Sequence, residues 1–325
     1  MTNNRRMLGR AGEPSKKKVL CAALIAVLFI VAAVCALIYG MPKAGGGSGS
    51  GAPGADTKRQ GAAGADNGDG QLIGLEIAGE PITAGEFRYA LHEIASVVVA
   101  SCASGEQSIG ADFWRSNTTE CTPEVSAQPR SEVERVQAQL TSAYSPASKK
   151  LCAAAAHPLE FALCKGVRLL EQQHAAYQQA VVAGHMHSAS WADVTQNIAT
   201  TNADHERAHS EGKAVYGLDS YDVPVYLSRY LSQLKDTYIN DDTAPGMAVT
   251  DAQVKQHYAE NTWDFGPEIA AIASESKRWD IIAASVKGDL RTTIYYDLLA
   301  ARVQEMDVTM NQENLVDFAA SALSY

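Results

Sequence analysis

A pair of histidines one helical turn apart is the arrangement in this sequence most typical of catalysis. His205, Glu206 and His209 match the H-E-x-x-H pattern, in which two histidines bind zinc and the glutamate acts as a base. A catalytic zinc needs a third protein ligand, and Val215 stands where the extended motif has a histidine. Because the surrounding residues are polar, a solvated helix face is the favoured interpretation, and a zinc metallopeptidase is the minor alternative.

The other residues able to do chemistry predict neither catalysis nor a cofactor. His174, His185 and His187 offer metal ligands, but histidines at this spacing near a helix end are more often exposed polar residues. No nucleophile elbow is recognisable, and no glycine-rich phosphate loop follows a strand. We therefore expect no catalytic residue, no bound metal and no cofactor.

Four of the six cysteines predict disulfide bonds. Cys21 and Cys35 lie in a long apolar run, and no C-x-x-C spacing among the others indicates a zinc site. If the domain is exported, it enters a compartment where disulfides persist. The expected bridging residues are Cys102, Cys121, Cys152 and Cys164.

Helix geometry favours one of the three possible pairings of these cysteines. Twelve positions separate Cys152 from Cys164, so in a continuous helix their Cα atoms would lie ~18 Å apart, beyond the ~7 Å that a disulfide spans. A break at Pro158 would weaken this argument. The sequence predicts a nested pattern, with Cys102 bonded to Cys164 and Cys121 bonded to Cys152.

Four tyrosines near one amphipathic helix predict either a core stripe or a binding surface. They are Tyr221, Tyr226, Tyr230 and Tyr238. Tyrosine offers apolar area with a polar tip and little rotamer entropy, which suits a peptide-binding groove. Core packing is the favoured interpretation for any one of them, and several together form the candidate peptide-binding surface.

The N-terminal residues predict a tail, a membrane anchor and a tether. Residues 1–18 carry six Lys or Arg and one Glu, a charge of +5. Residues 19–40 contain no charged side chain and match the ~20 residues that cross a bilayer. Residues 41–70 are rich in Gly, Ala and Ser, which is typical of a flexible linker. The basic flank predicts a cytoplasmic N-terminus.

This reading places residues 71–325 on the extracytoplasmic side of a cell membrane. A cleaved signal peptide is the alternative, but the apolar run is longer than the ~7–15 residues of a usual signal core. The whole chain has a net charge of −10, which leaves −15 after the tail. Such an acidic domain is a poor ligand for nucleic acid.

The domain after the linker is expected to be mainly α with a small β element. Leu75 and Ile77 alternate as in a short strand. Thr83 and Glu86 form a capping box for a helix that ends near Cys102.

Later segments extend this helical pattern. Residues 103–147 are rich in Ser, Thr, Gly and Pro and predict an irregular segment. Residues 307–310 are expected to pair with the first strand. Apolar periodicity predicts helices over roughly 158–184, 190–212, 224–238, 250–261 and 268–305.

In their order along the chain, these segments resemble the N-terminal domain of the extracytoplasmic foldases SurA and PrsA. IAGEPITAGEFRYAL resembles the family's strand, glycine turn and first helix, and VRLLEQQHAAYQQAVVAGH resembles its long second helix. VTDAQVKQHYAEN is similar to the segment that precedes the isomerase module of that family. The resemblance covers roughly residues 72–310 and implies a SurA N-terminal-like helical chaperone domain that binds unfolded, exported polypeptides.

The sequence departs from that family at the isomerase module. A parvulin domain of about 90–100 residues is expected after the YAEN segment, but only TWDFGPE separates that segment from the last long helix. We therefore expect a membrane-anchored, chaperone-like protein without prolyl isomerase activity. The alternative from another functional class is a surface scaffold protein that binds one dedicated partner.

Overall fold

A computed structural model describes residues 69–102, 111–116, 119–121, 132–215 and 217–324. Every described residue belongs to one compact unit, Gly64–Tyr325. The predicted tail and anchor, and the linker up to residue 68, lie outside the described residues. Among the helices that are described, none has the length and apolar character to cross a membrane.

Three short strands form one antiparallel sheet in the order β2-β1-β3. They are β1 (Leu72–Ile77), β2 (Glu80–Thr83) and β3 (Val308–Met310). Alternate residues of β1 are buried, and Glu76 of β1 pairs with Thr309 of β3. The prediction that residues 307–310 pair with the first strand is therefore confirmed.

Two long helices form the centre of the described domain. The first, α2 (Ala84–Cys102), starts where the Thr83 hydroxyl accepts a hydrogen bond from the Glu86 backbone N–H at 3.3 Å. This is one half of the predicted capping box, and the Glu86 carboxylate contacts His174 instead. It packs along α6 (Pro158–Val182), most of whose residues are buried. Because α6 is covered on nearly all sides, it forms the core of the helical packing. It is in contact with α2, α5 (Pro146–Ala153), α8 (Val223–Asn240), α11 (Glu275–Glu305) and α12 (Gln312–Ala322).

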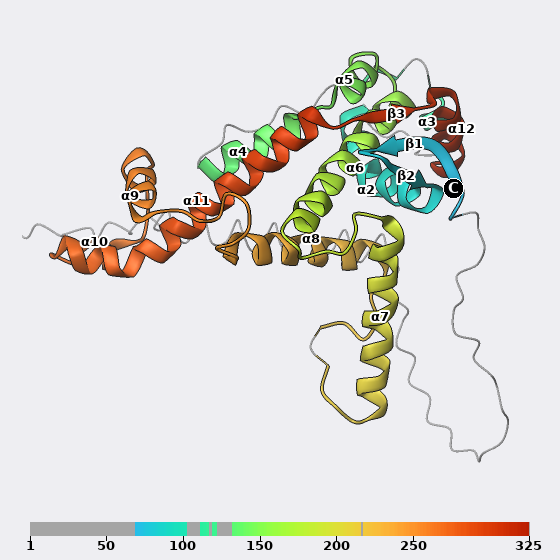
Figure 1. Cartoon of the computed structure of the whole chain (residues 1–325). Helices are drawn as coiled ribbons and strands as arrows, with labels where there is room; N and C mark the ends of the chain where they lie inside the picture. The colour runs from blue at the N-terminus through green and yellow to red at the C-terminus, as the bar shows by residue number, and fades with distance from the viewer. Residues whose placement is uncertain (1–68, 103–110, 117–118, 122–131, 216, 325) are drawn as a thin grey trace, which may run out of the picture. The chain divides into compact units, whose positions relative to one another are not determined.

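The remaining helices after α6 follow the predicted order (Figure 1). Their predicted N-terminal signals are present: Ser190 caps one helix, Pro224 lies in the first turn of another, and Thr250 caps a third. The short α10 and the C-terminal α12 were not predicted, although Pro267 begins the first and Asn311 caps the second. These helices are α7 (Trp191–Ser210), α8 (Val223–Asn240), α9 (Asp251–Glu260), α10 (Pro267–Ala270), α11 (Glu275–Glu305) and α12 (Gln312–Ala322).

The expectation of an irregular segment over residues 103–147 is wrong in part. The described portion contains α3 (Ala111–Trp114), α4 (Glu132–Ser142) and the start of α5 (Pro146–Ala153). Helix α4 buries only Val136, Leu140 and the following Ala143, and it packs lengthwise against α11. A helix of this length gains most of its stability from tertiary packing, which its own sequence does not reveal.

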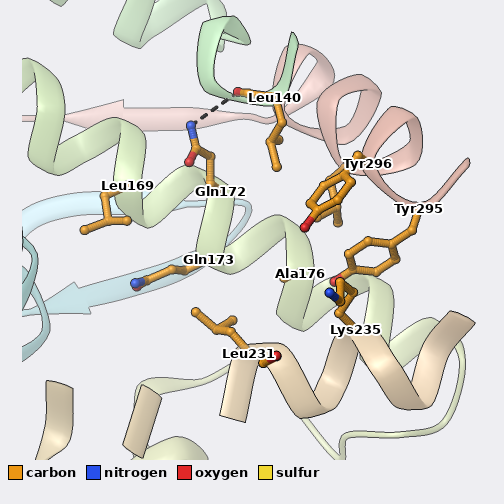
Figure 2. A pocket seen from close by; sticks show the side chains of 11 residues that line it. Leu140, Leu169, Gln172, Gln173, Ala176, Leu231, Lys235, Tyr295 and Tyr296 are labelled. Carbon is orange, nitrogen blue, oxygen red and sulfur yellow. Dashed lines mark hydrogen bonds between the residues drawn. The ribbon is translucent and has the colours of Figure 1, made fainter. Parts of the chain in front are cut away.

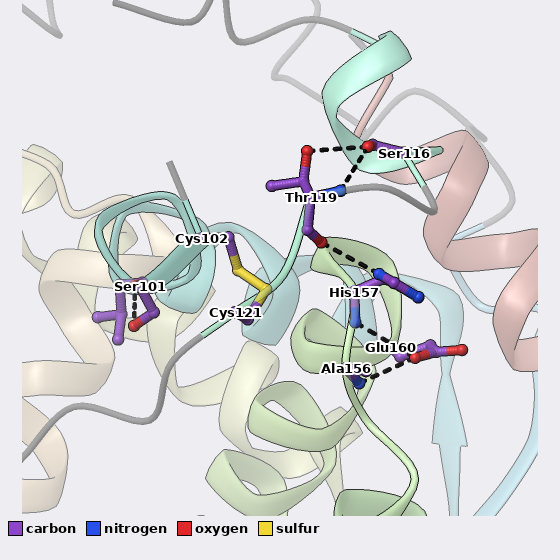
Figure 3. Close-up of a disulfide and its surroundings, with 9 residues drawn as sticks. Ser101, Cys102, Ser116, Thr119, Cys121, Ala156, His157 and Glu160 are labelled. Carbon is purple, nitrogen blue, oxygen red and sulfur yellow. Dashed lines mark hydrogen bonds between the residues drawn. A yellow bond between two sulfur atoms is a disulfide. The ribbon is translucent and has the colours of Figure 1, made fainter. Parts of the chain in front are cut away.

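The disulfide pairing also differs from the nested prediction. Cys102 is bonded to Cys121, and Cys152 is bonded to Cys164, with Cα atoms 4.0 Å and 4.9 Å apart. The nested pairing is wrong because α5 and α6 are separate helices and the chain reverses between them. Figure 3 shows Cys121 beside this reversal, where its backbone N–H donates to the Ala156 carbonyl at 3.0 Å.

Candidate binding groove

The candidate functional site is a hollow of about 310 Å³ between four helices, hereafter the central groove (Figure 2). Helices α4, α6, α8 and α11 each contribute side chains to it. Its volume lies at the lower end of ligand sites, enough for one or two apolar side chains. The lining residues are Leu140, Leu169, Gln172, Gln173, Ala176, Leu231, Ser232, Lys235, Tyr295, Tyr296 and Leu299.

The walls of the central groove are held together by hydrogen bonds between its helices. The Gln172 side-chain amide of α6 donates to the Leu140 carbonyl at the end of α4 at 3.3 Å (Figure 2). The Gln137 amide donates to the Tyr296 hydroxyl at 3.0 Å, which joins α4 to α11. The Tyr295 ring packs against the Tyr238 ring with centroids 5.3 Å apart. The groove is therefore a built feature of four packed helices.

The chemistry of the central groove suits binding through apolar contact. Its lining residues include no carboxylate, histidine or cysteine, and Lys235 is its single cationic side chain. Burial raises the pKa of Tyr295, with Tyr296 and Tyr238 adding to the effect, so its hydroxyl stays protonated. An apolar side chain placed here would lose contact with water, which stabilises a complex by ~25 cal/mol for each Å² buried.

A second hollow, of about 530 Å³, lies where α2 meets the starts of α7 and α8. The rings of Tyr89 and Trp191 stack in its wall with centroids 6.0 Å apart. Burial raises the pKa of Tyr89 to about 12, with Glu93 adding to the rise. The Gln173 amide donates to the Tyr89 hydroxyl at 3.4 Å, so an α6 side chain that lines the central groove also contacts a residue that lines the second hollow.

Buried polar pairs fix α6 in the position that the groove requires. His174 Nε2 lies 2.8 Å from a Glu86 carboxylate oxygen, and both side chains are buried. The Glu171 carboxylate accepts hydrogen bonds from the Ser145 and Ser148 hydroxyls at 2.6 and 2.9 Å. Burial raises the pKa of Glu171, an effect that the two serine bonds oppose. These contacts tie α2 and α5 to the central helix.

The structure corrects the tyrosine surface predicted from the sequence. Tyr221, Tyr226 and Tyr238 are buried, with 6%, 8% and 1% of their surface exposed, and Tyr230 is half-buried. They pack in apolar clusters between α7 and α8 or against α11, as stacked or edge-on pairs. Core packing therefore describes three of the four, and none of them lines the central groove.

The histidines of the H-E-x-x-H motif bind the loop that follows α7. His205 Nδ1 lies 2.8 Å from the Leu218 carbonyl, and His209 Nε2 lies 3.0 Å from an Asp219 carboxylate oxygen. Glu206 is exposed. Across the described part of the chain, no three His, Cys, Asp or Glu side chains are grouped closely enough to hold a metal ion.

The sequence did not point to the residues that line the two hollows. Adjacent tyrosines at 295 and 296 fall on different faces of α11, so only their packing shows that both reach the groove. Trp191, directly after the Ser190 cap, offered a signal, since tryptophan side chains are large and highly buried on average.

Sequence comparison places the chain beside a known chaperone. It is 29% identical over 152 residues to the chaperone for lacto-N-biosidase of Bifidobacterium longum subsp. longum. The similarity covers 47% of this chain and 52% of the relative, so the chain spans about half the length of the curated relative it matches. No model of a protein family matches the chain, and no solved structure matches it.

Proposed function

We propose that this chain is a chaperone for an exported polypeptide, anchored in a cell membrane by residues 19–40, with its helical domain on the extracytoplasmic side. The observation that carries the proposal is the similarity of nearly half of the chain to a protein named as a chaperone. The apolar groove between four helices supports it physically. The resemblance of the ordered segments to SurA and PrsA favours the same role.

The proposed action needs no covalent step. An unfolded client exposes apolar side chains, and the central groove shields one or two of them from water until the client folds. In place of a parvulin module, a short link joins Asn261 to α10 and α11, and we therefore propose that the protein has no isomerase activity. Because the motif histidines have hydrogen-bonding partners in their own loop, the metallopeptidase alternative gains no support from the geometry.

The name of the relative favours one dedicated client over a broad range. The relative is named as the chaperone for a single enzyme, lacto-N-biosidase. We propose that the client of this chain is also an exported glycoside hydrolase. This choice combines chaperone action with the dedicated partner that the sequence left as an alternative.

Refolding of a model client tests the proposal. A lacto-N-biosidase unfolded in denaturant would be diluted into buffer with the full-length chain in detergent micelles, or with albumin in the same micelles. We expect the chain to increase recovered enzyme activity and to reduce light scattering. An unrelated unfolded enzyme, tested in parallel, measures the breadth of the client range.

A pair of matched variants tests the groove. Leu231 lines it, whereas Leu218 lies in the loop after α7 and is 50% exposed. Leu231→Asn should lower the recovered activity, and Leu218→Asn should leave it unchanged, with circular dichroism verifying the fold of both. No gain over albumin would refute the chaperone role, and equal rescue of the unrelated enzyme would refute only the dedicated client. Full rescue by a folded Leu231→Asn protein would place client binding elsewhere.

A further inference from the structure

Three aromatic rings are stacked in a row at the end of α9 and in the segment that follows it, and we call them the aromatic ladder: Tyr258, Trp263 and Phe265. The Trp263 ring stacks on Tyr258 with centroids 6.0 Å apart and on Phe265 with centroids 5.4 Å apart. The Trp263 indole N–H donates to the Tyr258 carbonyl at 3.0 Å, which fixes its orientation. Trp279, at the start of α11, meets Tyr258 edge-on at 5.5 Å.

The ladder is open to solvent on its outer side. Beneath it, Val254 of α9 and Ile282 and Val286 of α11 form a small buried cluster. Tyr258 is 37% exposed, and Trp263 and Phe265 are only half-buried. Helix α9 packs against the start of α11, at the end of that helix remote from β3 (Figure 1). The described domain therefore leaves a large aromatic surface partly uncovered.

The segment that carries most of the ladder is acidic. The segment 258–269 contains Glu260, Asp264 and Glu268, all exposed, and no Lys or Arg. Within the described residues, none of these three carboxylates takes part in an ion pair. The nearby cation Lys255 lies over the Trp279 ring, 6.0 Å from its centroid. The ladder is thus an aromatic surface with an acidic edge.

We propose that the aromatic ladder is a second docking surface for the client, and that it takes an extended segment with large apolar side chains beside Lys or Arg. The proposal rests on the chaperone function proposed above. Aromatic rings attract both apolar groups and cations, and the three carboxylates favour a basic partner. The same carboxylates oppose an anionic lipid surface or a nucleic acid at this site.

Peptide binding tests this assignment. Three fluorescent peptides of equal length would carry the same two Trp and two Leu residues, with Lys, Ser or Glu between them. Anisotropy would be measured with the full-length chain in neutral detergent, at low and at high salt. We expect the lysine peptide to bind most tightly and the glutamate peptide least tightly, with the difference decreasing at high salt because exposed charges are screened.

Variants that replace Glu by Gln remove a charge but keep the shape of the side chain, so they locate the surface without disturbing its packing. Glu260→Gln with Glu268→Gln should weaken binding of the lysine peptide about fivefold, as expected for the loss of two exposed charge contacts. The matched control, Glu76→Gln with Glu313→Gln, removes two exposed carboxylates from β1 and α12 and should leave binding unchanged. A third variant, Tyr258→Ser, should weaken binding of the serine peptide as well as that of the lysine peptide.

Several outcomes would overturn the docking surface. Equal affinity for the lysine and glutamate peptides would show that the surface does not prefer a basic partner. Equal losses of affinity in the ladder and control variants would show that only the net charge of the chain matters. Either result together with intact rescue of the unfolded enzyme would refute the ladder alone. No peptide binding together with no rescue would refute the chaperone function itself. Tighter binding to anionic vesicles than to the lysine peptide would assign the surface to a membrane.

Discussion

Removing the bridge between Cys152 and Cys164 should destabilise the domain without unfolding it. The bridge closes a loop with a sequence separation of 12, and the bridge from Cys102 to Cys121 closes one of 19. From loop-closure entropy, each bridge is expected to stabilise the folded state by ~3 kcal/mol, with little difference between the two. Helix α5 keeps its hydrogen bonds from Ser145 and Ser148 to α6, so the α5–α6 corner retains contacts when the bridge is lost.

The assay is equilibrium unfolding in guanidinium chloride of the wild-type chain and two double variants. Cys152→Ala with Cys164→Ala, and Cys102→Ala with Cys121→Ala, should each lower the free energy of unfolding by ~3 kcal/mol. Because the structure pairs the cysteines within each variant, neither variant should contain a free thiol among the four cysteines of the described domain. Under the nested pairing, each variant would break both bridges and leave two such thiols.

Trypsin digestion without reduction gives an independent result. No Lys or Arg lies between Leu151 and Lys165, so trypsin releases Cys152 and Cys164 in one peptide. A disulfide between these two cysteines makes that peptide lighter by two hydrogen atoms. The pairing in the structure should therefore give this single peptide. A species in which it is linked to the peptides of Cys102 and Cys121 would refute the pairing and the loop lengths on which the magnitude depends.

Two further predictions concern the packing of the domain. Burial raises the pKa of Glu171 above its ordinary 4.5, so the folded state holds that proton more tightly and stability falls as the pH rises from below 4.5 through the raised pKa. Glu171→Gln should flatten this part of a curve of unfolding free energy against pH, and an unchanged slope would contradict the assignment. A Cβ at Gly246 would lie 3.0 Å from a methyl carbon of Ile294 at a φ of +83°. Gly246→Ala should cost ~1–3 kcal/mol in chemical denaturation, and more than Gly212→Ala, where φ is +68° and no atom lies within 4 Å of the added carbon.

The helices with strong local signals were predictable from the sequence. Thr250 with Gln253 forms both halves of a capping box, and Ser190 accepts a hydrogen bond from the Asp193 backbone at 3.2 Å. Such signals act within four residues, so they need no knowledge of the rest of the chain. The alternation that placed Leu75 inward is equally local, and the structure buries it at 2% exposure.

The groove and the disulfide pairing depend on contacts that have no local signature. Leu140 and Leu299 line the same hollow although 158 positions lie between them. The reversal between α5 and α6 brings Cys152 and Cys164 together, and a continuous helix was the assumption that excluded this pair. Pro158 correctly indicated a break between the two helices, because a proline begins a helix more readily than it continues one.

Helix α11 connects the two surfaces proposed to hold a client. Trp279 lies beside the ladder and Tyr296 in the central groove, 17 positions apart on one helix of 31 residues. At ~1.5 Å per residue this separation is ~25 Å along the axis, which an extended chain covers in about eight residues. A single client segment of modest length is therefore able to reach both surfaces, and two weak contacts linked in this way bind far more tightly than either alone. The continuity of α11 is what holds the two sites at a fixed separation, so a dedicated client can be selected by the spacing of its apolar anchors as well as by their chemistry.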